Sequence, residues 1–155
     1  MLALILCIFA LAAGSYVSAI HYEDNPRNFH RQRISEMTAI DGMLFVKSRN
    51  FPSNLILNCY AIKKERQLSS STFQYMVYTA PQPPQGVYNI HGTVVTTETT
   101  SRHTAANAIR FQTAQGVQPS LFKLMYIDEQ RSCLILVRMR IPGVRGEYFA
   151  HKFSS

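Results

Sequence analysis

The stretch FKLMYIDEQRSCLILVRMR, residues 122–140, holds two apolar runs on either side of the polar tetrad Asp128–Arg131. The runs, Leu121–Ile127 and Ser132–Met139, are rich in residues that favour a pleated, half-buried surface. Four polar residues between two such runs are typical of a β-hairpin loop. We therefore predict a hairpin here, with Cys133 near the start of its second strand.

The same pattern recurs along most of the chain. Six more short runs of alternating or β-branched residues are separated by turn segments, such as the proline-rich residues 81–86. These runs predict strands at residues 43–48, 54–63, 72–79, 86–99, 107–113 and 147–153. We expect the strand at 86–99 to bend or bulge at Gly92, because an isolated glycine in a strand pattern often marks a bulge.

Eight strands at hairpin spacing, with no long helical pattern between any two, predict an all-β fold. Eight antiparallel strands joined in chain order close into an up-and-down barrel, which leaves no sheet edge exposed. We therefore predict an eight-stranded antiparallel up-and-down barrel over residues 41–155, with a two-sheet sandwich as the structural alternative. Barrels of this size can hold one small ligand.

The N-terminal segment has the composition of a secretory signal. It is apolar over Met1–Ala13 and ends with the small residues of Val17–Ala19, as a signal peptidase site does. A membrane anchor needs about 20 apolar residues, and this run is shorter. We predict a signal peptide at residues 1–19 and secretion, with an uncleaved anchor as the alternative. The polar residues 20–40 follow, with a short helix within Asn28–Met37.

The charge of the chain says little about a specific partner. The formal net charge is +7, which favours anionic partners in general. The basic residues are scattered, however, and Lys63-Lys64 is the longest basic run. We therefore expect no nucleic-acid partner. Separately, we expect no stable membrane insertion and a monomeric protein.

The sequence offers no clear catalytic or metal-binding set. Its five histidines lie in unrelated contexts, and the G-x-S-x-G motif of serine hydrolases is absent. His91, His151 and Lys152 could form a ribonuclease-like site, but histidines without a catalytic role are far commoner. No two histidines have metal-ligand spacing with a carboxylate nearby. We expect a protein that is not an enzyme and has neither metal nor cofactor.

Aromatic residues are abundant in the predicted strands. In a barrel, the inward-facing set is both the core and the wall of a cavity, where a few polar groups orient the ligand. The strand-borne aromatic residues are Phe73, Tyr75, Tyr78, Tyr88, Phe111, Phe122, Tyr126, Tyr148 and Phe149. The residues alone thus predict a secreted β-barrel that binds a small molecule. The alternative is a barrel with a solid core that acts as a protein-interaction module.

The order of these segments resembles the salivary lipocalins of ticks, the group that includes the histamine-binding proteins. After the signal come HYEDNP, LNCYAI, TFQYMVY and NAIRFQTAQG, then YIDEQRSCLILVR, a Pro-Gly turn and GEYFAHKF. The resemblance implies an eight-stranded barrel with a short N-terminal helix, secreted in saliva. It also implies sequestration of a small host mediator, either a biogenic amine such as histamine or serotonin, or a lipid mediator such as a leukotriene.

The resemblance also suggests which residues hold the ligand. Glu147 aligns with an acidic residue of the family's final strand that can contact an amine, and Glu98 and Asp41 are possible helpers. The chain has no tryptophan and few acidic residues, however, so we favour an apolar or anionic ligand over histamine. Strand-borne arginines and tyrosine hydroxyls would then orient it. The expected ligand-binding residues are Tyr75, Tyr78, Arg110, Tyr126, Arg138 and Glu147.

The sequence allows two predictions for the bonding of the cysteines. Cys7 leaves with the signal, and two cysteines in an oxidising compartment, Cys59 and Cys133, are compatible with one disulfide. The family resemblance implies instead that each is half of a disulfide whose partner lies in C-terminal sequence that this chain lacks. On that basis we expect two free thiols, and a truncated or diverged member of the group.

Overall fold

The computed structural model describes residues 22–49, 57–81, 89–100, 102–139 and 149–154. The predicted signal peptide, residues 1–19, lies outside the described residues, as does Glu147. None of the helices in the described part is long and apolar enough to cross a membrane.

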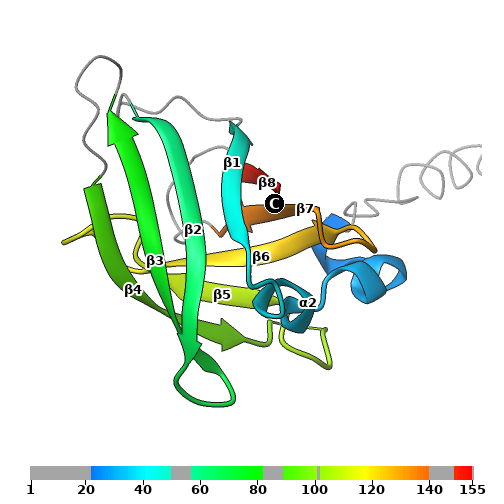
Figure 1. Ribbon diagram of the computed structural model, residues 1–155. Helices are drawn as coiled ribbons and strands as arrows, with labels where there is room; N and C mark the ends of the chain where they lie inside the picture. Colours follow the sequence, from blue (N-terminus) through cyan, green and yellow to red (C-terminus); the bar gives the residue numbers. More distant parts are fainter. Residues whose placement is uncertain (1–21, 50–56, 82–88, 101, 140–148, 155) are drawn as a thin grey trace, which may run out of the picture.

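The described chain is mostly antiparallel β-structure, arranged as one strongly curled sheet (Figure 1). Its strands are β1 Met43–Arg49, β2 Leu57–Gln67, β3 Thr72–Pro81, β4 Asn89–Glu98, β5 Ala108–Phe111, β6 Ser120–Ile127, β7 Cys133–Arg138 and β8 Phe149–Ser154. Neighbours in the chain pair with one another, and β8 pairs with both β7 and β1. The prediction of an all-β, antiparallel fold is confirmed, and no second sheet is present among the described strands.

The pairing between β4 and β5 is short. It consists of Thr96 with Arg110, Thr97 with Ile109 and Glu98 with Ala108. The rest of β4, residues 89–95, pairs only with β3 among the described strands. The bulge expected at Gly92 is wrong, because the register between β3 and β4 continues without a shift through that residue.

Three short helical segments precede the sheet: η1 Tyr22–Asp24, η2 Pro26–Arg31 and α2 Ile34–Thr38. The carboxamide oxygen of Asn25 accepts a hydrogen bond from the Arg27 amide at 3.1 Å and caps η2, whose first residue is a proline. The predicted helix within residues 28–37 is therefore present in two pieces. The break falls at Gln32, whose buried side chain donates to the carbonyl oxygens of Tyr22 and Met125.

Polar contacts hold this N-terminal segment against β6 and the turn that follows it. The Lys123 ammonium, buried on the outer side of β6, donates to the Asp24 carboxylate at 2.6 Å. Arg31 pairs with Glu129 in the β6–β7 turn at 2.7 Å. The amide of Ile34, the first residue of α2, donates to the carbonyl of Ala106 at 2.9 Å. Figure 1 shows α2 at the end of the sheet where β1 begins.

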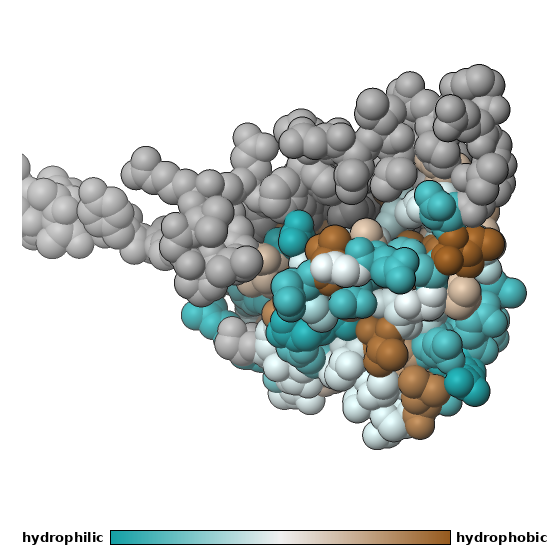
Figure 2. Space-filling view, turned by 90° about the vertical axis from the view of Figure 1, so that its left-hand side faces the viewer, coloured by the Kyte–Doolittle hydropathy of each residue, from teal (hydrophilic) through white to brown (hydrophobic). Residues whose placement is uncertain are grey.

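The strands β1 to β4 have an outer face that carries exposed apolar side chains. Ile90 and Val94 on β4 are more than half exposed, and Phe45 on β1 is 44% exposed. Figure 2 views the molecule from the side of β3 and β4 and shows separate hydrophobic side chains among polar ones. Each lies between residues whose side chains point to the opposite face, as strand geometry requires.

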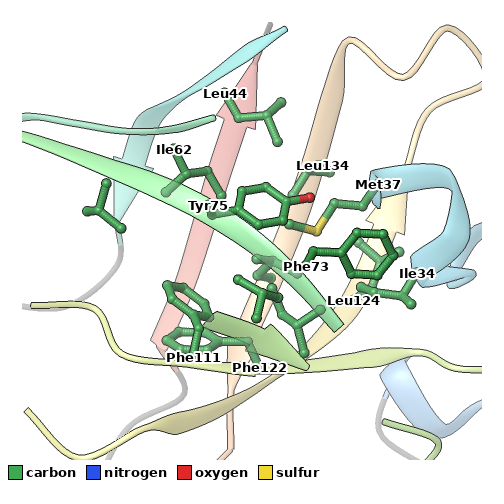
Figure 3. Packing of buried hydrophobic residues seen from close by; sticks show 14 of the residues in the cluster. Ile34, Met37, Leu44, Ile62, Phe73, Tyr75, Phe111, Phe122, Leu124 and Leu134 are labelled. Carbon is green, nitrogen blue, oxygen red and sulfur yellow. The ribbon is translucent and has the colours of Figure 1, made fainter. Parts of the chain in front are cut away.

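The core lies on the inner face of the curled sheet (Figure 3). Along β3, the alternate residues Phe73, Tyr75 and Val77 are buried. They belong to one cluster with Ile34 and Met37 of α2 and with residues from the other strands, including Leu44, Ile62, Ile109, Phe122, Leu124, Leu134 and Leu136. Burial of each large apolar side chain contributes about 1.5–3 kcal/mol to folding. The alternation of buried residues along β3 therefore identifies the inner face of that strand.

The predicted hairpin at residues 121–139 is confirmed, and Asp128 shapes its turn. The Asp128 carboxylate accepts hydrogen bonds from the Ser132 hydroxyl at 2.5 Å and from the Cys133 amide at 2.9 Å. These bonds lower the pKa of Asp128, with the Ser132 hydroxyl as the largest cause. Arg131 adopts a left-handed φ of 57° in this turn, and its guanidinium pairs with Glu36 of α2 at 2.6 Å.

Cys133 carries a free thiol. It pairs with Ser154 on β8, and Ser154 pairs in turn with Phe45 on β1. Both β8 and β1 therefore lie between Cys133 and β2, the strand of Cys59. With strands about 4.8 Å apart, this separation exceeds the roughly 7 Å between Cα atoms that a disulfide can span. The prediction that Cys133 is not bonded to Cys59 is confirmed.

Candidate functional site

The inner surface of β3 and β4 combines apolar residues with a few polar ones. Cross-strand pairing places Tyr75 opposite Thr93 and Val77 opposite His91. Tyr75 and Thr93 are 2% and 5% exposed, and Val77 is fully buried. His91 and Thr93 are two residues apart on β4, so their side chains point to the same face.

These three polar residues, Tyr75, His91 and Thr93, form the inner polar trio. The Tyr75 hydroxyl, the Thr93 hydroxyl and the His91 Nε2 atom are buried, and each lacks a hydrogen-bond partner among the described residues. Buried polar atoms in native proteins nearly always have a partner. Leaving one without a partner costs about 1–3 kcal/mol. The trio therefore offers hydrogen-bonding capacity that the described chain does not use.

The trio carries no charge at neutral pH. Burial raises the pKa of Tyr75 above its ordinary value, and the negative charge of Asp41 adds to the shift. The Tyr75 hydroxyl therefore keeps its proton and can donate a hydrogen bond. Burial lowers the pKa of His91, so its imidazole is neutral, with one nitrogen that donates and one that accepts.

A cation lies on the inner face at the end of the sheet away from α2. Arg138 ends β7, where it alternates with Leu134 and Leu136 and pairs with the core residue Phe122. Its Nη2 donates to the hydroxyl oxygen of Ser120 at 2.7 Å. The Arg138 guanidinium thus places positive charge at this end of the inner face.

The charge at the helical end of the interior is already neutralised. The Lys64 ammonium donates to the carbonyl oxygen of Thr38 at 2.7 Å and pairs with the Asp41 carboxylate at 2.7 Å. The hydrogen bond and the positive charge of Lys64 lower the pKa of Asp41. Asp41 itself is a surface residue, so it does not supply a carboxylate to the interior.

Two of the six ligand-binding residues expected from sequence, Tyr75 and Arg138, lie on the inner face. Tyr78, Arg110 and Tyr126 face outward and do not line the interior. Tyr78 lies opposite the exposed Ile90.

The outward residues Arg110 and Tyr126 have partners on the outer surface. The Arg110 guanidinium donates to both carboxylate oxygens of Glu98, at 2.6 and 3.1 Å. Glu98 is therefore engaged outside the interior and does not act as the expected helper for an amine. The ring of Tyr126 lies under the Arg31 guanidinium of η2, 5.9 Å from its centroid.

The ribonuclease-like alternative gains no support from the strand order. His91 is on β4 and His151 on β8, and these strands are not neighbours. Among the described residues, no group of three or more histidine, cysteine or acidic side chains could hold a metal ion.

The N-terminal helices border two surface cavities. One, of about 290 Å³, lies between η2, α2 and the β6–β7 turn, and ion pairs surround it. The other, of about 320 Å³, lies beside the stacked rings of Phe29 and His103, whose centroids are 3.8 Å apart. The buried Gln32 carboxamide oxygen also has no partner in the described part of the chain, and Gln32 lines this second cavity. The inner polar trio gathers more unused hydrogen-bonding atoms than either cavity.

Sequence reasoning missed Thr93 and gave His91 a different role. In the stretch NIHGTVVTTE, threonine is an ordinary strand residue, and alternation does not say which face is covered. No protein-family model matches the chain, and no curated protein matches it. The resemblance to tick salivary lipocalins therefore stays a proposal.

Proposed function

We propose that the protein is a secreted, non-enzymatic binding protein that holds one small molecule inside a lipocalin-like, eight-stranded barrel. Pairing of β8 with both β7 and β1 supports a complete barrel. The observation that carries the function is the inner polar trio, whose buried hydrogen-bonding atoms have no partner within the described chain. Binding pockets combine apolar walls with a small number of such groups.

The electrostatics of the interior favour an apolar or anionic ligand over a biogenic amine. Every described acidic residue lies in the N-terminal segment, in a turn or on an outer face, and Asp24, Glu98 and Glu129 are paired there with basic side chains. An ammonium group in a dry interior needs a carboxylate, because an unpaired buried charge is costly. Arg138 at one end of the inner face supplies the opposite charge. We therefore favour a lipid mediator or another amphiphile with an acidic group.

A protein-interaction module with a solid core is the second candidate, and the outer face of β1 to β4 supports it. Ile90, Val94 and Phe45 are exposed there, and an exposed apolar side chain can be buried against a partner protein. Such a protein would bind a macromolecule through this face and no small molecule in its interior.

Calorimetric titration of the chain from residue 20 to 155 tests the proposal. Histamine, serotonin, a leukotriene and a long-chain fatty acid are titrated in parallel, and we expect saturable one-site binding of at least one acidic amphiphile. Arg138→Ala should weaken that binding about tenfold or more, because a hydrogen bond to a charged group contributes about 1.5–3 kcal/mol. Arg110→Ala removes an outward arginine and is the matched control, expected to leave affinity unchanged.

Two outcomes would contradict the proposal. A folded protein that binds none of these ligands would favour the solid-core module. Micromolar or tighter histamine binding that is lost in Glu147→Gln would show that the ligand is an amine rather than an acidic amphiphile.

A further inference from the structure

We propose that the inner polar trio, Tyr75, His91 and Thr93, is a recognition site for an uncharged oxygen-bearing group, a hydroxyl or a carbonyl, on an apolar ligand. This inference rests on the proposed function, binding in the interior, and adds the chemistry that the middle of the ligand must carry.

The three residues lie on one inner surface, at two neighbouring levels of the β3–β4 pair. Tyr75 and Thr93 form a cross-strand pair, and His91 follows one step further from α2, opposite Val77. The Tyr75 side chain extends from β3 into the core, with its hydroxyl toward Met37 and Leu134 (Figure 3). A ligand that lies along β3 and β4 would pass all three polar atoms.

The three polar atoms are not needed to pack the core around them. Phe73, Val77 and Val95, inward neighbours of the trio on the same two strands, are buried and apolar, whereas Asn89, the next residue on this face of β4 beyond His91, is exposed. Phenylalanine in place of Tyr75, or valine in place of Thr93, would fill nearly the same volume without a buried hydroxyl. Because no described residue satisfies these hydroxyls, they are best explained as groups that meet a bound molecule.

The protonation of the trio decides which kind of group it can bind. Two hydroxyls and a neutral imidazole provide both donors and acceptors but no charge. A buried ammonium would lack a carboxylate here, and a buried carboxylate would lack a cation, so either would be strongly disfavoured. The bound group must therefore carry no charge and must form a hydrogen bond with the trio. A hydroxyl or carbonyl group does both, because its oxygen is uncharged and accepts a hydrogen bond from a hydroxyl donor.

The test compares ligands that differ only in this oxygen. Stearic acid, the positional isomers of hydroxystearic acid, an oxostearic acid and octadecylamine each displace a fluorescent fatty-acid probe from the chain of residues 20–155. We expect at least one hydroxy or oxo acid to bind about tenfold or more tightly than stearic acid, as a newly satisfied buried hydrogen bond predicts. Octadecylamine should bind no more tightly than stearic acid.

Variants assign the preference to the trio. Thr93→Val and Tyr75→Phe should each reduce the preference for the oxygenated acid while leaving the affinity for stearic acid within about twofold. Thr79→Val is the matched control, because Thr79 is also buried and inward but its hydroxyl already donates to the carbonyl oxygen of Asn89 at 3.4 Å. It should keep the full preference.

The outcomes separate this inference from the proposed function. If no acid displaces the probe and the probe itself does not bind, interior binding fails, and the inference fails with it. If stearic acid binds as tightly as every oxygenated acid, interior binding stands and the inference is overturned. A preference that survives in both Thr93→Val and Tyr75→Phe also overturns it.

Discussion

At the scale of one residue, Thr93 and Thr79 compare a buried hydroxyl without a hydrogen-bond partner with one that has a partner. Both threonines are buried and face inward, on β4 and β3, but of the two only the Thr79 hydroxyl has a hydrogen-bond partner within the described residues. A buried polar group without a partner costs about 1–3 kcal/mol, whereas a satisfied hydrogen bond contributes about 0.5–1.5 kcal/mol. An unpartnered Thr93 hydroxyl thus lowers the stability of the ligand-free protein, and under the proposed function a bound ligand would supply the missing partner.

We therefore expect Thr93→Val to raise the free energy of unfolding of the ligand-free protein by about 1 kcal/mol, because it removes an unsatisfied hydroxyl at nearly constant volume. Thr79→Val should lower it by about 0.5–1.5 kcal/mol, because the carbonyl oxygen of Asn89 loses its donor. Urea denaturation measures both values. If Thr93→Val destabilises the protein as much as Thr79→Val does, an ordered water rather than a ligand satisfies Thr93.

Sequence alternation names the two faces of a strand but leaves open which of them looks inward. Arg110 and Arg138 lie in similar strand patterns, and both were candidates for the ligand site. The pairing of Arg138 with Phe122 places it inward, whereas Arg110 pairs with Thr96 and binds the outward Glu98. The inner site was therefore only partly predictable, because the register between strands decides the face.

The β6–β7 hairpin is the element that the sequence predicts best. Two apolar runs around a polar tetrad leave few other local structures open, and Asp128 can bond the backbone two or more residues ahead of it. The helix within residues 28–37 is less predictable, because the buried Gln32 turns toward carbonyl groups that are distant in the sequence. Register shifts occur between Val46 and Ser48 and between Leu124 and Tyr126, where no glycine signals them.

The turn gives a second prediction. Asp128→Ala removes the acceptor of two hydrogen bonds, and we expect it to lower the free energy of unfolding by about 1–3 kcal/mol. Glu129→Ala is the control in the same turn: its carboxylate is 81% exposed, so its ion pair contributes about 0–1 kcal/mol. Equal effects of the two substitutions in urea denaturation would contradict the role of Asp128.

The contribution of the Asp128 carboxylate to stability depends on pH, and its lowered pKa gives the direction of that dependence. The folded pKa of Asp128 is lower than its ordinary value of 3.8. Its carboxylate therefore stabilises the fold above pH 3.8, and this contribution is lost as the pH falls through the lowered pKa. The stability difference between the wild type and Asp128→Ala should shrink in acid in the same range.

At the scale of the whole molecule, strand order decides what the cysteines can do. A sequence with two cysteines beyond the predicted signal segment is compatible with one disulfide, and spacing along the chain cannot exclude it. The curled sheet excludes it, because Cys133 on β7 is separated from β2 by β8 and β1. Long-range topology of this kind follows from how all the strands pair, which no single segment encodes.

The cysteines give the last prediction. The chain from residue 20 to 155, denatured without reductant, should release about two thiols per monomer, because strand order keeps Cys59 and Cys133 apart. Cys133→Ser should release about one, which assigns the count to each residue. If a monomer releases none, Cys59 and Cys133 are bonded and the pairing of β7 and β1 through β8 is wrong.

If two thiols are found, the fold lacks a cross-link generally worth about 2–4 kcal/mol. A ligand at 100 times its Kd stabilises the native state by about 2.7 kcal/mol, which is comparable to the contribution of the missing cross-link. A bound ligand should therefore raise the melting temperature by a readily measured amount.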